Sequence, residues 1–127
     1  MVRDVIATDR APGAVGPYSQ AIRTDRLVFT AGQIPIDPAT GKLVEGTIED
    51  QTRRVLDNLG AVLEAAGSGL DRAVKMTVFM TDLGLFQRMN AVYAEYFPTA
   101  PPARSAFQVG ALPLGAAIEI EAVALVG

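Results

Sequence analysis

The sequence predicts a single α+β domain in which two helices pack on one face of a mixed β-sheet. Two stretches carry apolar residues at helical spacing, and several others alternate apolar and polar residues as strands do. Half of the 127 residues are hydrophobic, 20% are charged and 6% are aromatic, which is typical of a close-packed aliphatic core. A chain of this length supports one domain, so we assign residues 1–127 to it.

The N-terminal third favours short strands separated by loops. Residues 2–7 predict a weak first strand, and the glycines and prolines that follow interrupt regular structure. Residues 19–23 and 27–31 are rich in strand-forming side chains and flank three polar residues, which predicts a hairpin. The segment DPATG is a turn signal, because Pro38 fixes its φ and Gly41 tolerates positive φ.

The first helix is predicted from Ile48 to Ala66. Its apolar residues fall on one helical face and its charged residues on the other. Thr47 is a candidate N-cap, and Gly67 is a natural helix stop. Residues 72–81 then alternate as a strand does, with one face made of Val74, Met76, Val78 and Met80.

A second helix is expected to start with Thr81 or Asp82 as its cap and to end before Pro98. One stripe of this helix carries Phe86, Met89, Asn90, Tyr93, Tyr96 and Phe97. Asn90 is polar among these residues, so we expect it to be buried and hydrogen-bonded, and secondarily to contact a ligand. Strands near residues 103–109 and 116–126 close the predicted order ββ(β)αβαββ.

The last strand divides into two faces. Its even-numbered residues from Ile118 are apolar and predict a helix-covered core, whereas Glu119 and Glu121 share the other face with Val123 and Leu125. A single chain would expose those two apolar residues, so we expect a second copy of the chain to cover this face.

Arg104 stands among small residues in the preceding strand. A charge on a covered face needs a partner, so Arg104 either pairs with Glu119 or Glu121 or receives an anionic ligand. Its guanidinium fits a carboxylate with two parallel hydrogen bonds. Spacing alone favours an interfacial salt bridge and leaves the anionic-ligand site open as the alternative.

The amino-acid composition excludes several kinds of catalytic and metal-binding site. The chain has no cysteine and no histidine, which excludes disulfides, thiol nucleophiles, histidine bases and the usual zinc ligand sets. Its net charge of -3 disfavours nucleic acid as a partner, and no segment predicts membrane insertion. We expect a cytoplasmic protein without a cofactor or a metal.

Tyr18 and Gly32 are further candidates for a ligand site. The loop GPYSQ could place Tyr18 beside a pocket, although ordinary packing explains a loop tyrosine equally well. Gly32 interrupts a strand, which indicates either a close approach to a ligand or a bulge, and the bulge is the simpler explanation.

Six motifs taken together resemble the Rid (YjgF/YER) family, specifically its RidA branch. They run in order along almost the whole chain: GPYSQ from Gly16, TAGQIP from Thr30, QTxxVLxNL from Gln51, NxVY from Asn90, PARS from Pro102 and IEIEA from Ile118. The resemblance implies a chorismate-mutase-like fold assembled as a homotrimeric barrel with clefts between subunits. It also implies a cofactor-free hydrolase, a deaminase of reactive 2-imino and 2-enamino acids such as 2-iminobutanoate and 2-iminopropanoate.

The resemblance also implies roles for single residues. Arg104 matches the arginine that holds the substrate carboxylate, and Glu119 matches the glutamate that positions the attacking water, with Glu121 structural. Tyr18 matches a cleft tyrosine, and Gly32 and Ala106 match positions that contact ligand through backbone groups. Asn90 matches a position near the cleft.

Two departures from the family and three rival functions remain open. Many relatives have serine in place of Ala31 and cysteine in place of Ala106. The rivals are a binding module for 2-oxo acids, a stress holdase, and an endoribonuclease or translation inhibitor. The acidic, histidine-free composition disfavours RNA cleavage.

Overall fold

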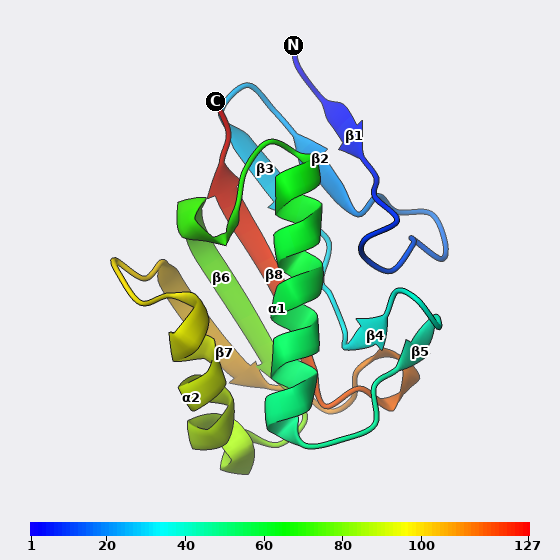
Figure 1. Ribbon diagram of the computed structural model, residues 1–127, viewed down its shortest axis with the longest axis vertical. Helices are drawn as coiled ribbons and strands as arrows, with labels where there is room; N and C mark the ends of the chain where they lie inside the picture. The colour runs from blue at the N-terminus through cyan, green and yellow to red at the C-terminus, as the bar shows by residue number, and fades with distance from the viewer.

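The computed structural model describes residues 1–127 as a six-stranded sheet with both helices on one of its faces (Figure 1). The spatial order is β1-β2-β3-β8-β6-β7. β6 and β7 pair in parallel and the other neighbours are antiparallel, so the predicted mixed sheet and α+β class are confirmed. The strands are β1 (Asp4–Ile6), β2 (Ala21–Arg23), β3 (Leu27–Thr30), β6 (Ala73–Met80), β7 (Ala103–Gln108) and β8 (Ile118–Leu125).

A small two-stranded ribbon, β4 (Ile36–Asp37) and β5 (Lys42–Leu43), flanks the predicted DPATG turn. Gly41 has a φ of 72°, as the turn requires. The buried Asn58 of the first helix donates hydrogen bonds to the carbonyls of Ile34 and Ile36 at 3.4 and 2.9 Å. The helix therefore holds the segment that leads into this ribbon.

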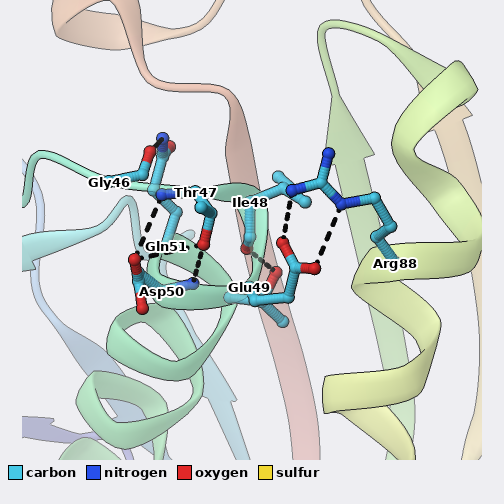
Figure 2. A network of polar contacts seen from close by, with 8 residues as sticks. Gly46, Thr47, Ile48, Glu49, Asp50, Gln51 and Arg88 are labelled. Carbon is cyan, nitrogen blue, oxygen red and sulfur yellow. Dashed lines mark hydrogen bonds and ion pairs between the residues drawn. The ribbon is translucent and has the colours of Figure 1, made fainter.

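Helix α1 (Ile48–Ala65) begins with a reciprocal cap at Thr47 (Figure 2). The Thr47 hydroxyl accepts from the Asp50 backbone N–H at 3.2 Å, and the Asp50 carboxylate accepts from the Thr47 N–H at 3.1 Å. These bonds satisfy donors that the first turn otherwise leaves unpaired. Gly67, with a φ of 81°, follows the last turn as predicted.

Helix α2 (Phe86–Tyr96) starts later than the expected cap at Thr81 or Asp82. The Asp82 carboxylate does accept from the Gly84 N–H at 2.8 Å, but it caps a single 3-10 turn, Leu83–Leu85, that precedes α2. Arg88 fixes α2 against the first turn of α1 through two hydrogen bonds to the Glu49 carboxylate, at 3.1 and 2.8 Å (Figure 2).

The core lies between the helices and one face of the central strands. Met76, Val78 and Met80 of β6 and the even-numbered residues of β8 are buried there, as the alternation predicts. Val74 is instead 40% exposed, so its predicted place on the Met76 face is wrong. A bulge between Ala73 and Lys75 shifts the register at this end of β6.

No helix covers the opposite face of the sheet (Figure 1). Val5, Phe29, Phe107 and Leu125 lie on this face and are 62%, 44%, 52% and 43% exposed. We call it the open face. No helix of the chain is both long and apolar enough to cross a membrane.

Candidate active site

Arg104 lies on the helix-covered side of the sheet. It is paired in parallel register with Met76 of β6, whose side chain is in the core, so both side chains point toward the helices. Glu119 and Glu121 are paired with Phe79 and Thr77 on the open face. The strand register therefore puts Arg104 and the two glutamates on opposite faces of one chain, so the expected salt bridge would have to join two chains.

The guanidinium of Arg104 is held by side chains of α2. Its Nη1 donates a 2.7 Å hydrogen bond to the Asn90 Oδ1, which accounts for the polar residue on the apolar stripe of this helix. Its central carbon lies 4.6 Å from the centre of the Tyr93 ring and 5.2 Å from that of Phe86. No other hydrogen bond from this guanidinium forms within the chain, so most of its five N–H donors remain available.

Ala106 lies two residues beyond Arg104 on the same face of β7 and is partly buried. The structure thus brings together three of the predicted site residues, Asn90, Arg104 and Ala106. We call them the arginine half-site. Because β7 is an edge strand, this half-site lies at the rim of the sheet.

Gly32 and Glu119 are in direct contact in a second group. A Cβ atom at position 32 would overlap the Glu119 carboxylate, while the φ of Gly32 is not in the left-handed region. Glycine is thus needed here for space and not for backbone freedom. The group that approaches Gly32 closely is thus the Glu119 carboxylate of the same chain.

Tyr18 completes this second group, which we call the glutamate half-site (Tyr18, Gly32 and Glu119). All three line one cavity of about 540 Å³, together with Ala31. The Tyr18 hydroxyl accepts from the Val15 N–H at 3.3 Å, and the side chain is 52% exposed. A larger cavity of about 830 Å³ lies over the N-terminal loop. Of the predicted site residues, only Tyr18 lines it.

Backbone hydrogen bonds fix the position of Gly32 relative to Glu119. Gln33 donates to the Ile120 carbonyl at 2.9 Å, and Ile120 donates back to the Gln33 carbonyl at 3.1 Å. Ala31 donates to the Gln20 carbonyl at 2.8 Å. Both neighbours of Gly32 are therefore fixed by backbone hydrogen bonds, which place the glycine beside the start of β8.

The Glu119 carboxyl is partly withdrawn from water. Burial raises its pKa above the ordinary value for glutamate, and the negative charge of Glu121 raises it further. No hydrogen bond to its carboxylate forms within the chain, so both oxygens can accept from a ligand or from water. The raised pKa makes this carboxylate a stronger base than an ordinary glutamate.

Sequence reasoning missed several residues of both half-sites. Phe86 and Tyr93 were assigned only to the apolar stripe of α2, although their spacing of four and three residues from Asn90 puts all three on one side of the helix. Pro113 and Leu114 of the loop before β8 line the cavity with Glu119. Leu114 is 72% exposed and has a φ of 59°, and no sequence signal marks that conformation.

The described side chains contain no group of three or more acidic, histidine or cysteine residues placed to hold a metal ion. The fold and the site define a small α+β domain with an arginine half-site on one side of its sheet and a glutamate half-site on the other.

A family model described as Endoribonuclease L-PSP matches residues 8–126. The chain is 54% identical to a RutC family protein of Pyrococcus horikoshii, covering 97% of this chain and 98% of that one. It is 47% identical to the human protein named 2-iminobutanoate/2-iminopropanoate deaminase, covering 100% and 93%. A crystal structure of a Rid family protein from Yersinia pestis superposes with a TM-score of 0.95 at 51% identity, covering 98% and 100%. The chain belongs to this family, the endoribonuclease L-PSP or Rid family.

Proposed function

We propose that this protein hydrolyses 2-imino acids, and their 2-enamino tautomers, to 2-oxo acids and ammonia. The observation that carries the proposal is an arginine with unused donors in one half-site and a partly buried carboxylate of raised pKa in the other. A 2-imino acid presents the two matching groups, a carboxylate and an electrophilic C=N carbon. 2-Iminobutanoate and 2-iminopropanoate are the substrates we name, and the human relative is named for the same pair.

The reaction is an addition of water followed by loss of ammonia. Arg104 binds the substrate carboxylate, and this orientation makes the attack effectively unimolecular. Glu119 takes a proton from water as the hydroxyl oxygen bonds to the carbon of the protonated imine, whose nitrogen becomes an amine. Glu119 then returns its proton to the amine, and the C–N bond of the tetrahedral intermediate breaks. The hydroxyl loses its proton as the carbonyl forms, and the nitrogen leaves as ammonia.

The two half-sites lie on opposite faces of one sheet, so we infer that different copies of the chain supply them. Three copies that pack their open faces into a barrel would bury Phe29, Phe107 and Leu125 and form clefts between neighbours. We propose that each cleft combines Arg104 of one copy with Glu119 of the next. The proposal keeps the cytoplasmic location expected from the sequence.

Arg104→Ala and Glu119→Gln test the reaction. A threonine dehydratase generates 2-iminobutanoate in situ, and semicarbazide competes for it as a trap. We expect the wild-type protein to divert the imine to 2-oxobutanoate, Arg104→Ala to lose the effect, and Glu119→Gln to lose about 10²- to 10⁴-fold in turnover while still binding 2-oxobutanoate.

Arg104→Lys is the matched control, because lysine keeps the charge but lacks the two-pronged geometry, and we expect intermediate activity. If the wild-type protein binds 2-oxobutanoate without accelerating hydrolysis, the protein is a binding module. If Arg104→Ala is as active as the wild type, the assignment of the arginine is wrong.

A further inference from the structure

The Tyr93 ring makes the shortest aromatic contact with the arginine half-site. The Arg104 central carbon is 4.6 Å from its centre, within the distance of about 6 Å at which a cation is attracted to the face of an aromatic ring. Tyr93 lies one helical turn beyond Asn90, whose side chain accepts the 2.7 Å hydrogen bond from Arg104. One side of α2 therefore supplies both a polar and an aromatic contact to the same guanidinium.

The hydroxyl of Tyr93 does not explain why the residue is buried. The side chain is 5% exposed, and its buried oxygen has no hydrogen-bond partner in the chain. A buried hydroxyl without a partner is unfavourable, so the stabilising contacts come from the ring. Those contacts are the Phe97 ring, with a centroid distance of 4.6 Å, and the Arg104 cation.

Electrostatics support the same pairing. Burial raises the pKa of the Tyr93 hydroxyl, and the positive charge of Arg104 partly opposes that shift. The phenol is therefore neutral at neutral pH, and the contact joins a cation and a neutral ring. Asn90 occupies one donor of the guanidinium and the ring occupies none, so the remaining N–H groups are free to meet a ligand.

We propose that Tyr93 is a positioning residue whose ring face holds the Arg104 guanidinium in the orientation that receives the substrate carboxylate. This proposal rests on the proposed function for the identity of the ligand, but the arrangement itself is a property of the unliganded protein. Phe86, at 5.2 Å, is a second and more distant ring against the same cation.

The direct test is the side-chain Nε–Hε signal of Arg104 in protein labelled with isotopic arginine, assigned by its loss in Arg104→Lys. We expect ring currents to move the Hε proton chemical shift to lower frequency in the wild type and in Tyr93→Phe. The displacement should be smaller in Tyr93→Leu. An undisplaced wild-type signal overturns the proposal without any variant having to fold. It is also overturned if the signal is the same in Tyr93→Leu as in the wild type.

Binding of 2-oxobutanoate, measured by calorimetry, gives the functional consequence. Tyr93→Leu should weaken this binding by about tenfold, equivalent to about 1.4 kcal/mol. Tyr93→Phe, which keeps the ring, should bind 2-oxobutanoate as the wild type does. Equal weakening in Tyr93→Phe assigns the effect to the hydroxyl and overturns the proposal. Failure of the imine assay with the arginine signal behaving as expected would overturn the proposed reaction and leave the positioning role standing.

Tyr96→Leu is the matched control on the same helix. The Tyr96 hydroxyl donates to Asp57 of α1 at 2.9 Å and does not contact Arg104. We expect this variant to lower the thermal stability while leaving both the arginine signal and the affinity for 2-oxobutanoate unchanged. If Tyr96→Leu changes them as much as Tyr93→Leu does, the effect is a general loosening of α2 and the positioning role is wrong.

Discussion

The Glu119 carboxylate occupies the space that any side chain at position 32 would need. Its raised pKa has two causes, burial first and the charge of Glu121 second. Because the pKa is raised in the folded protein, this carboxyl contributes to stability at low pH, and the contribution is lost as the pH rises through the folded-state pKa. The same group must lose its proton to act as the proposed base. A rise in pH through its pKa should therefore lower stability and raise activity.

Glu121→Gln tests this electrostatic coupling at the level of one residue. Removing the neighbouring charge lowers the pKa of Glu119, so the acidic limb of the kcat/KM profile for imine hydrolysis should move to lower pH. Glu64→Gln removes the same charge from α1, on the other side of the sheet, and should leave the limb in place. Equal shifts in both variants would mean that net charge, and not the pair, sets the profile.

At the scale of elements, the first turn of α1 supports both helices. Thr47 and Asp50 cap it, and Glu49 in the same turn binds Arg88 of α2 (Figure 2). The hydrogen bonds from Arg88 lower the pKa of the Glu49 carboxyl, so the pair stays ionised at neutral pH. This turn is thus an anchor for the helix that carries the arginine-holding residues.

Thr47→Ala tests that anchor. Alanine cannot accept from the Asp50 N–H, so the free energy of unfolding should fall by about 1 kcal/mol, as in other helix caps. The midpoint of urea unfolding, measured at one fixed protein concentration, is the readout. Thr47→Ser keeps the acceptor and should unfold close to the wild type. An unchanged midpoint in Thr47→Ala would show that the cap does not limit stability.

Elements with a clear period were predictable from sequence, and relations between elements were not. The alternation in β8 correctly separates Ile118 from Glu119, because each strand residue reports its own face. Nothing in the sequence reports the register of β7 against β6, which decides that Arg104 faces the helices. The same limit hid the bulge beside Val74 and the two-residue strands of the β4–β5 ribbon, which are too short to alternate.

The candidate site shows the same division. Arg104, Asn90, Gly32 and Glu119 could each be singled out by residue type and motif, but not the contacts between them. The hydrogen bond between Arg104 and Asn90 needs α2 to lie over β7. The apolar stripe of α2 does not show that Phe86 and Tyr93 contact Arg104, because a helical stripe carries no information about what it covers.

At the scale of the whole molecule, one sheet separates the two halves of the proposed site. The arginine half-site lies on the helix side of an edge strand, and Glu119 lies on the open side of β8. The open face carries exposed Phe29, Phe107 and Leu125, which a second copy can bury. The proposed site is therefore complete only where two copies of the chain meet.

Mixing two inactive variants tests this claim most directly. Arg104→Ala and Glu119→Gln, unfolded and refolded together in equal amounts, should regain about a quarter of the wild-type imine hydrolysis, because in a cyclic assembly about one cleft in four then has both intact residues. Each variant refolded alone is the control and should stay inactive. A mixture no more active than its components would contradict a site shared between copies.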